Sequence, residues 1–276
     1  MKRLVITADD FGAAVEVNEA VERAHRDGIL TAASLMVTGA AFDDAVTRAR
    51  DLPTLGVGLH VVLVEGRPVL PPQQLPALVD SHGQFRTDMG RMGFEIFASP
   101  AARKQLLAEV EAQFAVFAAT GLPLDHVNAH KHFHLHPTVA AAILKVGRHY
   151  GMKAVRAPIE PQRLLRMVDG TRTGSRVEGG WGRLVRRRMR AAKMAVPDQV
   201  IGLAWSGAMN ANRMHGILQH LPSGLTEIYA HPATGPYPGA ASGYDYCGDL
   251  AALTDPLAKE LIARDRLTLG RFADFV

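Results

Sequence analysis

The stretch RLVITADDFG (residues 3–12) places an apolar run, Leu4 to Thr7, directly before two aspartates and a glycine. A run of this kind predicts a buried strand whose carboxyl end carries polar side chains. The next residues, about 13 to 27, repeat apolar positions at helical spacing and stop at Gly28, so we expect a helix there. A strand that leads directly into a helix is typical of the α/β fold class.

The same alternation continues along the chain. Strands are expected at 30–39 and 55–64, with a short helix at 42–50 between them. Right-handed crossovers with this alternation build either an open parallel sheet or a barrel. The later segments repeat the pattern, with strands or strand ends at 124–132, 153–158, 200–207 and 225–232 and helices at 101–119, 137–150 and 254–265. The sequence contains no internal repeat, which favours a single domain over residues 1–276.

Two regions depart from this alternation. Residues 65–100 are rich in Pro, Gly and Gln and predict a long loop, and such loops in compact domains usually have a function. Residues 163–195 should be helical in part, with breaks at GTRTG (170–174) and EGGWG (178–182).

The composition excludes a disordered chain, because 47% of the residues are apolar and 21% are charged. Cys247 is the single cysteine, so any metal must be held by imidazole and carboxylate groups. The aspartates follow the basic start of the chain too soon for a signal peptide, and no apolar run reaches the roughly eighteen residues of a spanning helix. We therefore expect a soluble cytoplasmic protein.

The positive charge is unevenly distributed. The net charge is +4, yet residues 162–200 carry ten Lys and Arg against three acidic residues. A basic segment of this kind indicates an anionic partner, either phospholipid headgroups or nucleic acid.

Polar side chains gather where the predicted strands end: Asp9 with Asp10, His60, a run of histidines, and Glu227 with His231. In parallel α/β folds the carboxyl ends of the strands converge on the active site. Of two adjacent aspartates, one could bind a metal while the other accepts a proton, or both could simply solvate a turn. His60 fits a metal ligand and a buried core histidine about equally well. His231, which precedes a proline, fits a general acid.

The stretch DHVNAHKHFHLHP (residues 125–137) holds five of the twelve histidines. In an extended chain alternate residues share a face, so His130, His132, His134 and His136 would point the same way. A metal rarely takes four ligands from one short strand, because the rings lie in a line. We expect one or two ligands, with the others lining a cleft, donating supporting hydrogen bonds or facing solvent. A solvated histidine-rich loop is the alternative.

Four ordered motifs resemble the YdjC-like carbohydrate deacetylase family, namely TADDFG (7–12), VGLH (57–60), HVNAHKHFHLHP (126–137) and YAHP (229–232). Three further stretches are similar to the subgroup associated with hopanoid biosynthesis, namely VERAHRDGILTAASLMVTG (21–39), LVEGRPVLPP (63–72) and GLAWSGAM (202–209).

The resemblance implies a distorted (β/α) TIM-like barrel with one divalent metal ion, zinc or magnesium. The implied ligands are Asp10, His60 and His130, with Asp9 as general base and His231 as general acid. Supporting roles are expected for Arg156, which could orient Asp9 or lie on the surface, and for His132, His134 and Glu227. Many family members have DSH where this chain has NAH, so Asn128 and Ala129 replace an aspartate and a serine.

The implied activity is metal-dependent removal of acetyl from an N-acetylglucosaminyl group, on a hopanoid lipid. Alternatives are a soluble chitooligosaccharide deacetylase, a non-enzymatic basic protein that binds membrane or nucleic acid, and a metal-dependent phosphoesterase. With a lipid substrate, residues 181–195 are expected to touch an anionic membrane, which adds peripheral contact at the inner membrane to the cytoplasmic location. No nucleic acid is expected as partner, and a homodimer is a further expectation.

Overall fold

A computed structural model describes residues 1–172 and 176–276 of the chain. At its centre lies the strand β1 (Lys2–Phe11), in which Leu4, Val5 and Ile6 are fully buried. Successive residues of a strand point to opposite faces, so β1 is covered on both faces, as parallel strands of α/β proteins usually are. This explains why the opening stretch of the sequence reads as a continuous apolar run.

The sheet follows the order β4-β3-β2-β1-β6-β5, with the short strand β7 beside β1, and the paired strands among the described residues are parallel. The other strands are β2 (Ala32–Leu35), β3 (Gly56–Val61), β4 (Val127–Ala129), β5 (Gln199–Ile201), β6 (Gly224–Ala230) and β7 (Thr268–Leu269). The carboxyl ends of these strands therefore face the same side of the molecule.

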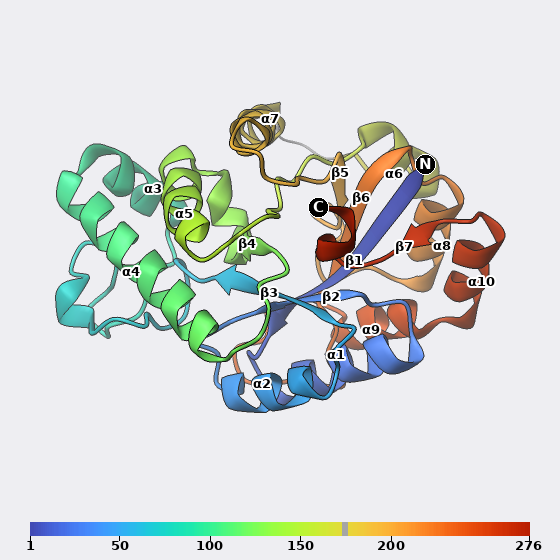
Figure 1. Ribbon diagram of the computed structural model, residues 1–276, viewed down its shortest axis with the longest axis horizontal. Helices are drawn as coiled ribbons and strands as arrows, with labels where there is room; N and C mark the ends of the chain where they lie inside the picture. The colour runs from blue at the N-terminus through green and yellow to red at the C-terminus, as the bar shows by residue number, and fades with distance from the viewer. Residues whose placement is uncertain (173–175) are drawn as a thin grey trace.

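Single bridges complete the curl of the sheet between its two edges. Val155 bridges to Val127 beside β4, and Ala154 bridges to Ala195 shortly before β5. The predicted strand at 153–158 thus consists of bridge residues rather than a regular strand. The sheet curls into a distorted barrel with helices outside it, which confirms the predicted α/β fold (Figure 1).

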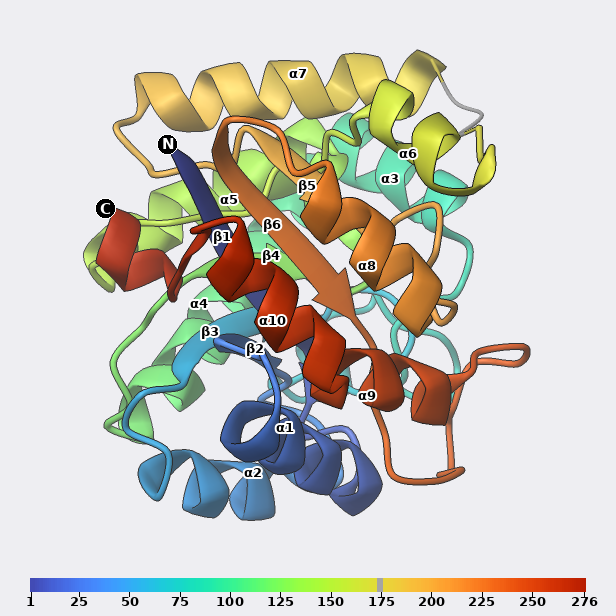
Figure 2. The same ribbon diagram turned by 90° about the vertical axis from the view of Figure 1, so that its right-hand side faces the viewer.

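Helices pack around the outside of the sheet (Figures 1 and 2). They include α1 (Val15–Asp27), α2 (Phe42–Arg50), α4 (Pro100–Ala119), α5 (Pro137–His149), α8 (Ala211–Gln219), α9 (Tyr246–Thr254) and α10 (Pro256–Arg264). Short 3-10 turns form at η1 (Pro72–Gln74), η2 (His130–Leu135) and η3 (Phe272–Phe275). None of the helices in the described part of the chain has the length and apolar character needed to cross a bilayer.

The predicted loop 65–100 contains a helix, so this prediction was wrong for its second half. The helix is α3 (Met89–Ala98), and the side chain of Asp88 caps it by accepting a hydrogen bond from the Arg91 N–H group. Met92 and Ile96 anchor it in the core. The two glycines within α3 weaken the helical signal of the sequence, and burial of one face offsets that loss.

The basic segment forms two helices, α6 (Gln162–Asp169) and α7 (Arg176–Ala191). The predicted break at 178–182 was wrong, because α7 continues through it, and Val185 and Met189 fix the helix to the core. The predicted break at 170–174 lies partly outside the described residues. Figure 2 shows α7 running along the top of the molecule.

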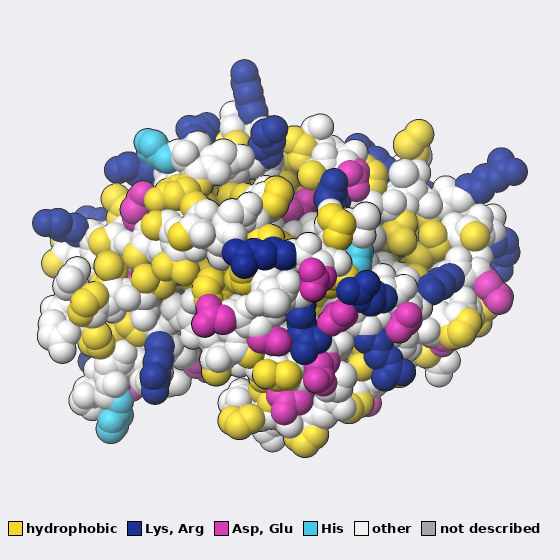
Figure 3. All heavy atoms as spheres, turned by 60° about the horizontal axis from the view of Figure 1, so that its bottom comes forward, with side chains coloured by type: hydrophobic (Ala, Val, Ile, Leu, Met, Phe, Trp, Pro, Cys, Tyr) yellow, Lys and Arg dark blue, Asp and Glu magenta, His cyan; other side chains and the backbone are white. Residues whose placement is uncertain are grey.

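On the opposite side of the molecule, acidic and basic side chains are intermixed (Figure 3). Here Arg48 bonds Glu22 at 2.6 Å and Asp44 at 2.9 Å, which links α1 to α2. This face therefore carries charges of both signs, whereas residues 181–191 of α7 include five arginines and no acidic residue.

Candidate metal centre and active site

Asp10 owes its position to an irregularity at the end of β1. The pairing of β1 with β2 shifts between Ala8 and Phe11. Asp10 itself adopts a left-handed backbone conformation with φ of 63°. Such a conformation is costly for a residue other than glycine and concentrates at functional sites. The shift turns Asp10 toward a partly open site, while its neighbour Asp9 is buried.

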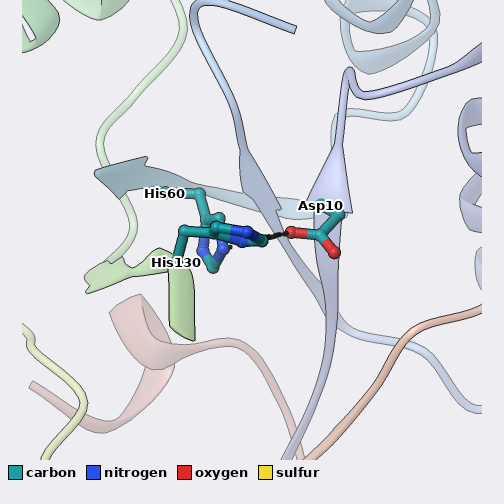
Figure 4. Close-up of side chains that lie close together, drawn as sticks. All are labelled: Asp10, His60 and His130. Carbon is teal, nitrogen blue, oxygen red and sulfur yellow. Dashed lines mark hydrogen bonds and ion pairs between the residues drawn. The ribbon is translucent and has the colours of Figure 1, made fainter. Parts of the chain in front are cut away.

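Asp10, His60 and His130 converge, although they come from β1, β3 and the start of η2. Asp10 Oδ1 lies 3.2 Å from His60 Nε2 and 3.1 Å from His130 Nδ1. Figure 4 shows both imidazole rings pointing toward the Asp10 carboxylate. One ligand atom from each residue lies within 4.8 Å of the others.

This donor set fits a divalent cation. One carboxylate and two imidazoles suit zinc and other borderline metals, and three protein ligands leave room for water and substrate. Burial opposes ionisation of Asp10, but His130 and His60 together hold its pKa well below the usual value. The carboxylate is thus ready as a ligand.

Asn128 supports this cluster and connects it to Asp9. Its Oδ1 accepts a hydrogen bond from His60 Nδ1 at 2.6 Å, which leaves His60 Nε2 as the nitrogen facing Asp10. Its Nδ2 donates to Asp9 Oδ1 at 3.1 Å and to Ser34 Oγ at 2.8 Å. An aspartate at this position could not donate to Asp9. The asparagine therefore fits this site through both ends of its amide.

Replacing Asn128 with alanine is expected to weaken zinc binding by about 10- to 100-fold, because His60 loses the partner that orients it. Asn128→Asp should keep that partner but lower the free energy of unfolding, since it would set a second carboxylate against Asp9. Competition with a chelator and urea unfolding measure the two effects. Asn210→Ala, at the remote cap of α8, is the control for zinc binding. Wild-type zinc affinity in Asn128→Ala would exclude this role.

Asp9, Arg156 and Glu227 form a buried ionic network. Arg156 donates to both oxygens of Asp9, with Nη1 2.5 Å from Oδ2 and Nη2 2.9 Å from Oδ1. The same guanidinium donates to Glu227 Oε1 from Nε at 3.0 Å and from Nη2 at 2.7 Å. Arg156 is 0% exposed, so the alternative of a surface arginine was wrong.

The network controls the charge of Asp9. Burial alone would raise the pKa of Asp9, but the charges of Arg156 and His60 hold it far below its usual value. Ser34 Oγ also donates to Asp9 Oδ1, at 2.9 Å. Sequence reasoning missed Ser34, which is buried within an apolar strand and has no distinguishing pattern around it.

The histidine run does not form the extended strand that we predicted. β4 ends at Ala129, and η2 follows with Lys131 and His132 in left-handed conformations (φ of 51° and 55°). The imidazoles therefore do not share one face. His130 contacts Asp10 in the candidate metal site, whereas His132 Nε2 lies 2.7 Å from the Tyr229 hydroxyl.

Burial disfavours the charged form of His132, His134 and His136. Burial lowers the pKa of His132 well below its usual value and lowers the pKa of His134 to about 3. Burial also lowers the pKa of His136. His134 is 0% exposed, and its ring centroid lies 5.9 Å from that of His132.

His231 lies at the end of β6, with its ring between Tyr229 and Tyr244 at centroid distances of 5.7 and 5.3 Å. Its Nδ1 is buried and has no hydrogen-bond partner among the described residues. Burial lowers the pKa of His231, while the negative charges of Asp10 and Asp9 oppose that shift. The ring is therefore close enough to both aspartates to sense their charge.

Asp249 of α9 holds the backbone on which His231 sits. Its Oδ2 accepts the His231 N–H group and its Oδ1 accepts the Met209 N–H group, both at 2.8 Å. The carboxylate is 1% exposed. Burial raises the pKa of Asp249 to about 7, although the two N–H groups favour the ionised form.

This raised pKa predicts a pH-dependent stability. Between about pH 4, where an unfolded aspartate titrates, and about pH 7, the folded state keeps a proton that the unfolded state has lost. The free energy of unfolding should fall as pH rises through this window and then level off. Relative to wild type, Asp249→Asn should therefore gain about 2 kcal/mol between pH 5 and pH 8 in urea unfolding. A difference that does not change with pH would contradict this expectation.

The chain is similar to known proteins over nearly its whole length. The YdjC-like protein family matches residues 3–264. A carbohydrate deacetylase of Brevibacillus brevis is 40% identical over 148 residues, which span 54% of this chain and 56% of that relative. A carbohydrate deacetylase of Geobacillus stearothermophilus is 30% identical over 276 residues, which span 98% of this chain and 97% of that relative.

The fold is also found in a crystal structure from Enterococcus faecalis, described as that of a cellobiose-phosphate cleavage protein. The two chains are 24% identical and superpose with a TM-score of 0.79, over 100% of this chain and 99% of the other. This structural likeness shows the fold alone. The family is shown by the sequence, through the match over residues 3–264 and the relative that is 30% identical over 98% of the chain. The protein therefore belongs to the YdjC-like family.

Proposed function

We propose that the protein is a hydrolytic carbohydrate deacetylase that depends on one divalent metal ion. The observation that carries this proposal is the convergence of Asp10, His60 and His130 beside a second, buried aspartate. The two relatives named carbohydrate deacetylases support the substrate class. A divalent cation held by these residues would polarise a carbonyl group and lower the pKa of a water molecule.

Asp9 is proposed as the proton acceptor. Among the described residues, its Oδ2 accepts one hydrogen bond, from Arg156, whereas its Oδ1 accepts three. Oδ2 therefore keeps a lone pair for the proton of an attacking water. Because Arg156 and His60 keep the pKa of Asp9 low, the carboxylate is ionised at neutral pH and can accept a proton, although the same charges make it a weak base.

His231 is proposed as the proton donor to the leaving amine. Its buried Nδ1 has no hydrogen-bond partner among the described residues, so no protein group competes for the proton on this nitrogen. Burial lowers its pKa, which makes the protonated ring a stronger acid. Because the protonated form of His231 becomes rarer as pH rises, the rate of deacetylation should fall as pH rises above the pKa of this ring.

For the substrate we propose an N-acetylglucosaminyl group on a hopanoid lipid. An apolar pocket of about 590 Å³ is lined by residues of α3, η2 and α7. Its lining includes Met89, Phe94, Phe97, His132, Trp181 and Leu203, and we call it the α3 pocket. His132 lines this pocket and follows the proposed ligand His130 by two residues in η2. This supports a substrate that has an apolar group for the pocket and a sugar for the metal site.

Contact of residues 181–195 with an anionic membrane is part of this proposal. Arg183, Arg187 and Arg188 are exposed on α7, which suits a surface of phospholipid headgroups. Arg186 differs, because its Nη1 donates to the Asp198 carbonyl oxygen at 2.9 Å.

The test is incubation of the purified protein, loaded with zinc or magnesium, with N-acetylglucosaminyl hopanoid and in parallel with diacetylchitobiose. Mass spectrometry follows the loss of one acetyl group. We expect loss from the hopanoid and none with Asp9→Asn. Loss from diacetylchitobiose alone would make the enzyme an oligosaccharide deacetylase. Loss from neither would contradict the proposed activity.

A further inference from the structure

Helix α3 turns two aromatic side chains into solvent. Phe94 and Phe97 are 72% and 67% exposed, while Met92 and Ile96 of the same helix are fully buried. Phe94 and Phe97 are three residues apart, so they lie on one face of the helix. Exposing two phenylalanines side by side opposes the hydrophobic effect, and such patches usually mark an interaction surface.

The exposed face of α3 continues onto α7. Phe94, Phe97 and Trp181 line the same α3 pocket, so both helices contribute to its lining. Trp181 and Leu184 on α7 are 43% and 50% exposed. Together these four exposed side chains form an apolar surface, which we call the rim. Three of them, Phe94, Phe97 and Trp181, also line the α3 pocket, as does His132.

Positive charge surrounds this rim. Arg183 and Arg187 on α7 and Arg91 on α3 are exposed. The acidic side chains near α3 are engaged: Glu95 bonds Arg86 at 2.7 Å, and Asp88 caps the helix. An apolar face with tryptophan and phenylalanine, bordered by arginines, is the pattern of a helix that lies in a bilayer interface. A protein partner would need no such bias toward arginine.

We propose that the rim formed by Phe94, Phe97, Trp181 and Leu184 inserts into an anionic phospholipid bilayer, so that the α3 pocket opens toward the lipid. This extends the contact beyond residues 181–195 to α3 and assigns the insertion to aromatic side chains. The proposed function supplies only the purpose of this contact, which is access to a substrate carried by a lipid. Contact with lipid can be measured without any substrate.

The experiment is co-sedimentation of the metal-loaded protein with vesicles of phosphatidylcholine, either alone or mixed with phosphatidylglycerol. We expect binding to the mixed vesicles. In Phe94→Ser/Phe97→Ser the affinity for these vesicles should fall by about tenfold or more, because each phenylalanine would otherwise bury a large apolar area in the bilayer. Arg183→Glu/Arg187→Glu should lose most of the preference for phosphatidylglycerol. Both exposed phenylalanines contribute little to the core, and an unchanged melting temperature would verify that the variant folds.

Helix α10 provides matched controls. Leu257 is 42% exposed and the Arg264 side chain is 60% exposed, and both lie on a different helix. Leu257→Ser and Arg264→Glu should bind mixed vesicles like wild type. Equal binding by Phe94→Ser/Phe97→Ser would overturn the proposal, as would equal losses in the controls. If the wild type were a dimer and Phe94→Ser/Phe97→Ser a monomer, the rim would be a contact with a second copy of the chain, and the proposal would also be overturned. Failure of the wild type to deacetylate any substrate would leave the vesicle result intact.

Discussion

Replacing Arg156 with methionine is expected to lower the free energy of unfolding by about 3–5 kcal/mol, the usual cost of removing one partner from a buried ion pair. Arg156 is 0% exposed and contacts two buried carboxylates, Asp9 and Glu227. Methionine fills similar volume but leaves both carboxylates without their counter-charge. Asp9 would then have to take up a proton or remain charged in an apolar surrounding, so its pKa should rise.

Arg48→Met is the matched control. Arg48 also contacts two carboxylates, Glu22 and Asp44, but its side chain is 24% exposed. Solvent screens such pairs, and their loss usually costs less than about 1 kcal/mol. Urea unfolding at neutral pH compares the two variants. Equal losses would mean that the buried network contributes no more than a surface pair.

The stabilisation by Arg156 should also depend on pH. Because the pKa of Asp9 is lowered in the folded protein, its contribution is complete above about pH 4, where an unfolded aspartate is ionised. It is lost as pH falls toward the lowered value. The difference between wild type and Arg156→Met should therefore narrow in acid.

Replacing Asp10 with alanine is expected to weaken zinc binding by far more than 100-fold, and activity should fall with it. Loss of a supporting partner alone costs about 10- to 100-fold, and Asp10 is the residue that both His60 and His130 face. Its alanine variant removes the single carboxylate of the cluster. His60→Ala should behave in the same way.

Isothermal titration with zinc, and separately with magnesium, measures this effect without any substrate. His149→Ala is the control, because His149 is exposed at the end of α5, away from the cluster. It should bind metal like wild type. Tight, unchanged binding in Asp10→Ala would mean that the cation is held elsewhere.

Much of the framework could be predicted from local sequence patterns. The apolar run before Asp9 specifies a buried strand, and the helix that follows is set by spacing and by Gly28. Parallel strands bring their carboxyl ends together, so the residues after them were sound candidates for one site. The ordered motifs then selected His130 from the histidine run.

The parts that could not be predicted depend on contacts between distant residues. The left-handed conformations of Lys131 and His132 have no sequence signal, because glycine is absent there. Asn128 acquires its role from His60 and Asp9, which lie 68 and 119 residues away. Helix α3 forms in a stretch whose glycines and prolines favour loop, because the core covers one of its faces.

Acetate release by metal-stripped protein, before and after the return of one equivalent of zinc or magnesium, tests the central claim most directly. With an N-acetylglucosaminyl substrate, we expect no release from the stripped protein, full release after one equivalent, and no further gain from a second. Asp10→Ala should stay inactive throughout. Undiminished release without metal, or release from Asp10→Ala that equals wild type, would contradict a single catalytic cation held by Asp10, His60 and His130.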